Sequence, residues 1–161
     1  MGDGATKLAL LIIFIGFVIH TIGFGAPYWQ VVGSKDLFRA GLWQICVINS
    51  CNEVDAADFT KIGFDNWFQA VRTLECFGLI GSIAVIIFVL LYSCIDGCST
   101  SKGVAIWNLI LCFVTGSLIL AAIIIFGAKS NNFAWAFGLT AGGGVCYILA
   151  GISMFFSMRS I

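Results

Sequence analysis

Four long stretches without a charged side chain limit what this sequence can fold into more than any other feature. They cover residues 8–34, 76–95, 103–128 and 130–158, and all 16 charged residues lie outside them. A helix that rises 1.5 Å per residue needs about 20 apolar residues to cross about 30 Å of hydrocarbon, and each stretch is long enough. The pattern predicts four membrane-spanning helices, near 8–26, 74–93, 104–128 and 133–158.

The composition of the chain supports this interpretation. Apolar residues make up 60% of the 161 residues and charged residues 10%, whereas a soluble domain has about 45–50% and about 25%. We therefore expect a membrane protein with one four-span domain over residues 1–161 and with membrane lipid around it. Since the net charge is zero, the chain has no basic surface for nucleic acid, and nucleic-acid binding is excluded as a function.

The connections between the predicted helices differ greatly in length. The loop 27–73 is by far the longest, whereas 129–132 is all that joins the last two helices. Pro27 ends the first helix, and Tyr28 and Trp29 suit the membrane interface. Four spans place both termini on one side, and most recognition outside the membrane is expected in 27–73.

Two sequence features indicate which side of the membrane holds the termini, and one of them is more informative than the other. The Lys/Arg bias is weak, with three such residues on the side of the termini and five on the other, which slightly disfavours cytoplasmic termini. The cysteines are more informative, because only Cys46 and Cys51 of the seven lie in the long loop. Such a pair favours a disulfide in an oxidising compartment. The alternative, a metal site, would need more ligands, and the loop has no histidine.

The long loop also carries patterns of secondary structure. Residues 28–32 and 39–48 are rich in β-branched and aromatic side chains, and the turn residues 33–36 separate them, which predicts a hairpin. Farther on, Asp65 or Asn66 can cap a helix that begins at Trp67 and leads into the second span.

The order of several loop residues is similar to that of a known superfamily. The residues concerned are Trp29, Gly41, Leu42, Trp43, Cys46, Cys51 and Arg72, the last just before a span. Together with the four-span layout, they resemble the signature of the claudin and peripheral-myelin-protein superfamily. The resemblance implies cytoplasmic termini, a small extracellular antiparallel β-sheet made largely by the first loop, and a Cys46–Cys51 bridge within it.

Two parts of the sequence resemble different branches of that superfamily. The short spacing of Cys46 and Cys51 is similar to that of the epithelial and peripheral myelin membrane proteins. Residues 69–74 resemble the claudin version of the entry into the second span. Both branches therefore stay open.

Small residues and cysteines near the helices supply further candidate sites. Gly138 with Gly142, and Gly144 with Gly151, can bring helices close together, either within the bundle, which we favour, or between neighbouring proteins. Cys94 and Cys98 flank the second span on the side of the termini. They are either palmitoylated or unmodified thiols.

The polar residues of the spans do not indicate transport or catalysis. His20, Glu75 and Asn108 are candidates for an ion route, but we expect Glu75 near the outer interface, and His20 alone cannot form a relay. The sequence shows no catalytic constellation. We therefore predict that the protein is not an enzyme and has no cofactor and no metal.

The sequence thus predicts a claudin-like adhesion protein in the plasma membrane at cell–cell junctions. It would act through the disulfide-stapled first loop and through lateral helix packing. Its partner would be a second copy or another junction protein. The alternatives are an auxiliary subunit of an ion channel or receptor and a myelin-protein-like membrane organiser.

Overall fold

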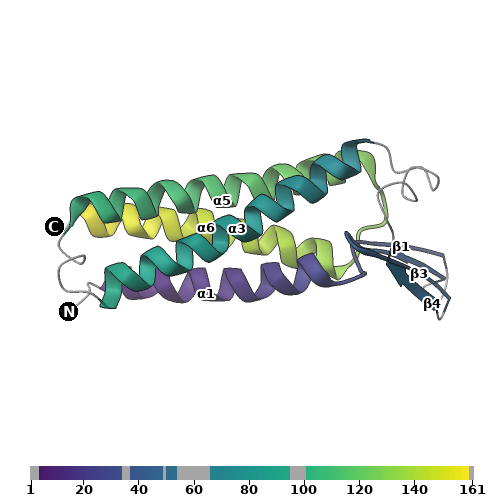
Figure 1. The fold of residues 1–161 in the computed structure, drawn as a ribbon, viewed down its shortest axis with the longest axis horizontal. Coiled ribbons are helices and arrows are strands. Elements are labelled where there is room, and N and C mark those ends of the chain that lie inside the picture. The colour runs from purple at the N-terminus through teal and green to yellow at the C-terminus, as the bar shows by residue number, and fades with distance from the viewer. Residues whose placement is uncertain (1–3, 34–36, 49, 54–65, 95–100, 160–161) are drawn as a thin grey trace.

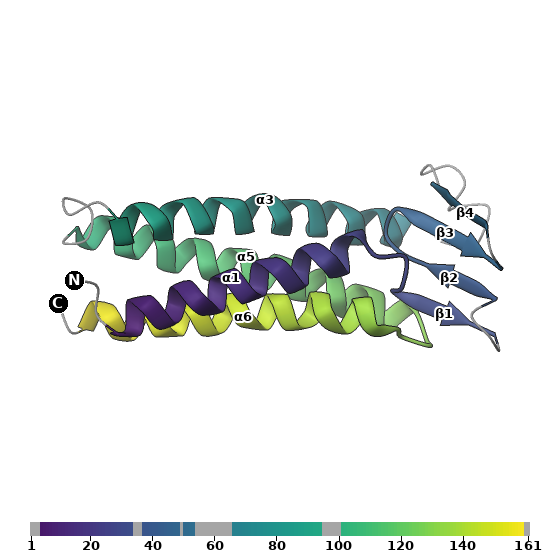
Figure 2. The same cartoon turned by 90° about the horizontal axis from the view of Figure 1, so that it is seen from below.

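The computed structural model describes residues 4–33, 37–48, 50–53, 66–94 and 101–159. Four long helices form a bundle, and a four-stranded sheet lies at the end opposite both termini (Figures 1 and 2). The helices are α1 (Gly4–Gly25), α3 (Asn66–Cys94), α5 (Lys102–Lys129) and α6 (Trp135–Arg159). The strands are β1 (Gln30–Val32), β2 (Phe38–Ala40), β3 (Gln44–Val47) and β4 (Ser50–Glu53).

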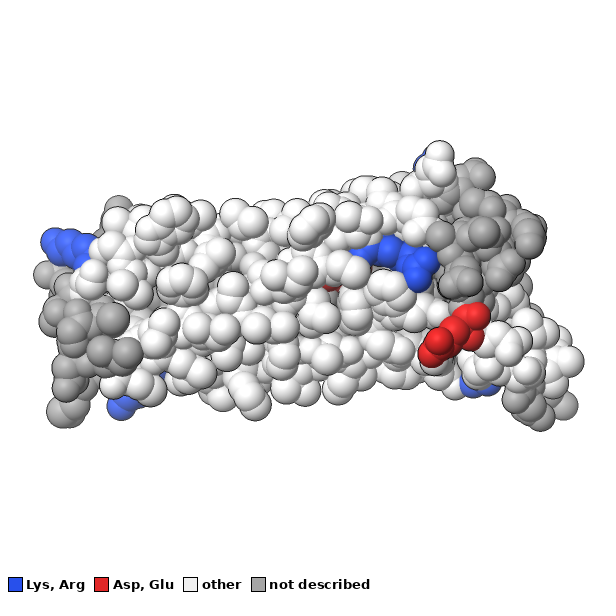
Figure 3. All heavy atoms as spheres, viewed as in Figure 1, with Lys and Arg blue, Asp and Glu red and all other residues white. Residues whose placement is uncertain are grey.

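All four helices are long and apolar enough to cross a membrane. The outward-facing side chains are largely apolar, and Ile80, Trp107 and Ile124 are among the most exposed. On the face shown in Figure 3, the charged side chains lie near the end with the termini and in the half nearer the sheet, and a wide uncharged band separates the two groups. The chain is therefore a multi-pass membrane protein, because lipid is the solvent that such a surface requires.

The sheet is antiparallel in the order β1-β2-β3-β4. A single hairpin of 28–32 with 39–48 was predicted. The antiparallel pairing of β1 with β2 confirms its first part. The prediction that 39–48 forms one strand is wrong. The chain turns again between β2 and β3, where the Gly41 N–H donates to the carbonyl of Gln44 over 2.9 Å. This turn divides 39–48 between two short strands, β2 and β3.

The helices pack unequally around the bundle. α1 packs chiefly on α6, and α3 packs chiefly on α5. The contact between α5 and α6 joins these two pairs of helices, whereas α1 and α3 share a smaller contact. Glycines permit the close approaches: a Cβ added to Gly143 would lie 2.7 Å from the Cβ of His20, and one added to Gly116 would lie 2.9 Å from the carbonyl oxygen of Gly144. Close backbone contact of this kind is typical of helices associating in lipid.

The predicted small-residue positions divide between the inside and the outside of the bundle. Gly144 lies against Ile119 and Leu120, and Gly151 lies against Phe113. Gly138 is exposed, and a Cβ there would meet no atom within 4 Å. Packing within the bundle is therefore the wrong interpretation for Gly138, because this residue faces away from the neighbouring helices.

We predict that Gly143→Val destabilises the bundle by about 1–3 kcal/mol, because the new side chain would overlap α1. Gly138→Val on the same helix is the matched control and should change stability much less. Denaturant unfolding in detergent micelles measures both variants. Equal losses would contradict the proposed α1–α6 contact.

Candidate functional site

The residues of the predicted signature converge where the sheet meets the bundle. Trp29 precedes β1, Gly41 to Trp43 form the turn between β2 and β3, and Arg72 lies in the first turns of α3. Trp29 and Leu42 belong to one hydrophobic cluster, against which Trp43 packs and which extends into the helix ends through Phe68 and Phe126. This junction sets how the sheet is presented at the end of the bundle.

Trp29 anchors the start of the sheet to the bundle. Its side chain is fully buried, and its indole Nε1–H donates to the carbonyl of Gly23 at the end of α1 over 2.8 Å. Its backbone N–H donates to the carbonyl of Ala40 over 2.9 Å. The edge of its ring meets Phe126 of α5 at a centroid distance of 5.1 Å. A single side chain thus joins α1, the sheet and α5.

The turn Gly41-Leu42-Trp43 seats the middle of the sheet on the bundle. A Cβ on Gly41 would lie 2.5 Å from the carbonyl oxygen of Ala26, so only glycine lets the turn approach the segment that leaves α1. Leu42 is fully buried in the same cluster as Trp29. The guanidinium carbon of Arg72 lies 4.4 Å from the centroid of the Trp43 ring, a cation–π contact between the turn and α3.

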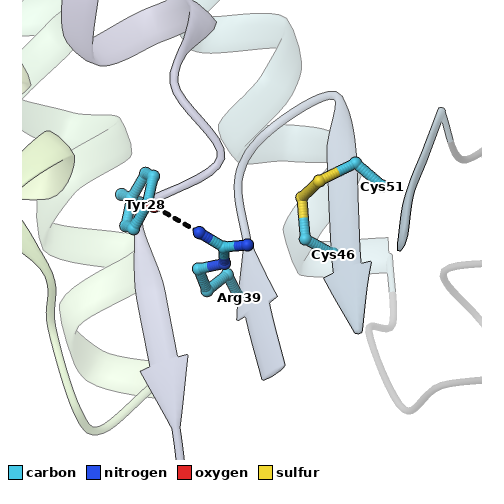
Figure 4. The surroundings of a disulfide bond; sticks show 4 residues. All are labelled: Tyr28, Arg39, Cys46 and Cys51. Carbon is cyan, nitrogen blue, oxygen red and sulfur yellow. Dashed lines mark hydrogen bonds between the residues drawn. A yellow bond between two sulfur atoms is a disulfide. The ribbon is translucent and has the colours of Figure 1, made fainter. Parts of the chain in front are cut away.

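The disulfide joins the last two strands on one face of the sheet. Cys46 and Cys51 are directly opposite each other on β3 and β4 and are bonded. Arg39 is the partner of Cys46 on β2, so it lies on the same face. Its guanidinium donates a hydrogen bond to the Tyr28 hydroxyl and also lies 5.0 Å from the centroid of that ring (Figure 4). Arg39 therefore ties the middle of this face back to the membrane end of the sheet.

The short connection between α5 and α6 pairs with β1 through an isolated bridge and backbone hydrogen bonds, which was not predicted from the sequence. The N–H of Val31 donates to the carbonyl of Asn132, and that of Ala134 donates to the carbonyl of Trp29. Gln30 and Phe133 form a bridge. The connection therefore covers the free edge of β1, and its described residues lie along β1.

The far end of the sheet exposes four large aliphatic side chains, which we call the tip patch. Val32 is 41%, Leu37 47%, Val47 51% and Ile48 61% exposed. The two turns that carry them lie side by side, since the Ile48 N–H donates to the carbonyl of Leu37 over 2.9 Å. Ile48 has φ 57°, which is strained for a β-branched residue. Strained backbone of this kind clusters at functional sites.

The polar residues of the spans do not line one route through the membrane. Glu75, which was expected near the outer interface, is fully buried between the helices and bonded to His20. The pair lies in the half of the bundle nearer the sheet, whereas Asn108 lies in the half of α5 nearer the termini. The sequence signal that could have paired His20 with Glu75 was the presence of one ionisable residue at similar depth in each of two spans.

Two further predictions concern the cysteines after the second span and the alternative of a metal site. Cys94 is exposed at the last residue of α3, and Cys98 lies outside the described residues. Within the described ranges, no three His, Cys, Asp or Glu side chains are grouped so that they could hold a metal ion.

We predict that Cys46→Ser weakens the sheet by about 2–5 kcal/mol, the usual effect of losing a disulfide in a small secreted domain. Surface biotinylation and limited proteolysis of cells expressing the variant should show less protein at the surface and faster cleavage. Cys146→Ser removes an unbridged thiol from α6 and serves as the control. Normal surface level and protease resistance for Cys46→Ser would argue against the structural importance of the bridge.

We also predict that Gly41→Ala costs about 1–3 kcal/mol, because the added methyl group would overlap the backbone at Ala26. Gly25→Ala is the matched control, since a Cβ at Gly25 meets no atom within 4 Å. Thermal unfolding in lipid nanodiscs compares the two variants. If both melt like the parent chain, the close approach at Gly41 is not what seats the turn.

Comparison with known proteins gives one informative result. A search of curated protein sequences finds no match. The model of the PMP-22/EMP/MP20/Claudin family matches residues 5–160, which include the sheet and all four helices except the first residue of α1. Since the match spans nearly the whole sequence, and since the fold has four spans with a disulfide-bonded sheet after the first, the chain belongs to the PMP-22/EMP/MP20/Claudin family.

Proposed function

We propose that this protein is a claudin-like adhesion protein of cell–cell junctions. It lies in the plasma membrane with both termini in the cytoplasm and the sheet outside the cell. The disulfide supports this orientation, because disulfides persist in oxidising compartments, and Cys46 and Cys51 lie in the sheet. The free thiol of Cys94 lies at the opposite end of the bundle, as expected for the reducing side. We expect the protein to have no catalytic activity.

The observation that carries this proposal is the tip patch. Exposed clusters of large apolar side chains on a protein surface mark interaction sites. β1 and β3 run away from the bundle, so Val32, Leu37, Val47 and Ile48 lie at the end of the sheet farthest from the membrane. A protein on a facing membrane would reach this end first. We propose that the partner at the tip is a second copy of this chain.

A second candidate function is an auxiliary subunit of an ion channel or receptor, or a myelin-protein-like membrane organiser. The observation that favours it is Gly138, which is exposed on α6 with open space around it. A glycine facing outward in a span lets the helix of another membrane protein approach closely. The short α5–α6 connection, which is paired with β1, also leaves fewer elements for contacts between cells.

The test uses tagged protein in cells that lack junctional claudins, mixed with cells that do not express it. Homotypic adhesion predicts enrichment only where two expressing cells touch, whereas a uniform surface distribution would exclude adhesion by this protein alone. In that case, co-purification in native lipid would test the second candidate, with Gly138→Leu expected to reduce recovery of the partner.

We predict that Ile48→Gly abolishes this enrichment while the fold is retained. Glycine removes the apolar side chain and relieves the positive φ, which costs about 1–2 kcal/mol for other residues. Ile48→Leu keeps an apolar side chain at the tip and is the control. Imaging of contacts, with surface biotinylation to normalise expression, measures both variants. Full enrichment of Ile48→Gly would exclude Ile48 from the contact.

A further inference from the structure

A single hydrogen bond joins His20 of α1 to Glu75 of α3 inside the bundle. His20 Nε2 lies 2.9 Å from Glu75 Oε2, and both side chains are fully buried. α1 and α3 meet over a shorter contact than the other neighbouring helices. The pair therefore lies at the part of the bundle where apolar packing contributes least to holding two helices together.

The immediate surroundings of this pair are apolar. Gly143 of α6 lies against the Cβ of His20, and the Phe24 ring meets the imidazole edge-on at 6.2 Å. From α5, Ile119 reaches Gly78, one turn after Glu75 on α3. Among the described residues, neither His20 Nδ1 nor Glu75 Oε1 has a hydrogen-bond partner.

The other titratable and charged groups near the pair are few. α3 contributes Cys76, the neighbour of Glu75, and Arg72, whose guanidinium lies over Trp43. α6 contributes Cys146 and Tyr147, which lie against Gly16, one turn before His20. The thiols and the phenol are ordinarily neutral at pH 7.

The number of protons on the pair determines its net charge. With no proton the pair has a charge of −1, with one proton it is neutral, and with two protons it has a charge of +1. A net charge in an apolar interior costs far more than a neutral pair that shares a hydrogen bond, even with His20 Nδ1 and Glu75 Oε1 unbonded to any described residue. We propose that His20 and Glu75 together bind one proton, and that this proton couples the packing of α1 against α3 to pH.

The direction of this coupling follows from proton counts. In water, a glutamate carboxyl has a pKa of about 4.3 and an imidazole a pKa of about 6.5. The unfolded chain therefore carries two protons on these residues below about pH 4.3, one between the two values, and none above about pH 6.5. Above pH 6.5 folding takes up a proton, so the unfolding equilibrium constant rises about tenfold per pH unit.

Glu75→Gln reverses this trend, which makes the proposal testable. The glutamine can still bond a neutral imidazole, but the folded pair now holds no proton. Below about pH 6.5 the unfolded variant binds a proton at His20, so its stability decreases as the pH falls. The wild-type chain should thus be more stable at pH 6.5 than at pH 8.5, and Glu75→Gln more stable at pH 8.5 than at pH 5.5.

The experiment is denaturant unfolding of the full chain in lipid bicelles from pH 5.5 to 8.5. The double variant His20→Gln/Glu75→Gln has no proton to bind at this site and reports the pH dependence of the rest of the chain. Relative to that background, the free energy of unfolding of the wild type should fall as the pH rises above about 6.5. That of Glu75→Gln should fall as the pH drops below about 6.5. A wild-type slope parallel to the double variant between pH 6.5 and 8.5 would overturn the proposal.

A second measurement decides the case if the double variant does not fold. His20 is the only histidine of the chain, so ¹⁵N-labelled histidine in nanodiscs gives the signals of one imidazole, one from each ring nitrogen. We expect both signals to stay unchanged from pH 5.5 to 8.0. A titration with a midpoint near pH 6.5 would overturn the proposal.

Discussion

The apolar interior of the membrane is the constraint on which the rest of this structure depends. Lipid offers backbone N–H and C=O groups no hydrogen-bond partner, so a spanning segment must satisfy these groups internally, as a helix does. The four open strands cannot lie at that depth. Once four helices occupy the membrane, the sheet has to be built at one end of the bundle from the loop between the first two spans.

The attachment of the sheet to the bundle rests on close backbone approaches and one large anchor. Gly41 lets the β2–β3 turn meet the segment that leaves α1, and Trp29 bonds to the last turn of α1 while it packs on α5. The connection around Asn132 adds backbone hydrogen bonds to β1. The sheet is held at its membrane end from three sides, and the exposed aliphatic side chains of the tip patch lie at its opposite end.

Within the bundle, two kinds of contact hold the helices together: close packing at glycines and one buried polar pair. Glycines such as Gly143 and Gly116 bring helices close enough for van der Waals contact, which is the main source of association in lipid. The His20–Glu75 pair contributes one polar contact between α1 and α3, whose shared surface is smaller. A polar pair of this kind is acceptable in an apolar interior only while it is neutral and bonded. Glycine packing is insensitive to pH, and the polar pair is not.

The sequence by itself determined the fold class, because charge-free stretches of sufficient length can only be membrane-spanning helices. It also indicated the sheet and the Cys46–Cys51 bridge, because both depend on residues close together in the chain. Four features depended on the tertiary structure: the close approach of Gly41 to Ala26, the pairing of 132–134 with β1, the outward direction of Gly138, and the bond between His20 and Glu75. Each is a relation between segments far apart in the chain or a choice of helix face. Such relations are decided by how helices of nearly uniform hydrophobicity rotate against one another, and local patterns carry no information about that rotation.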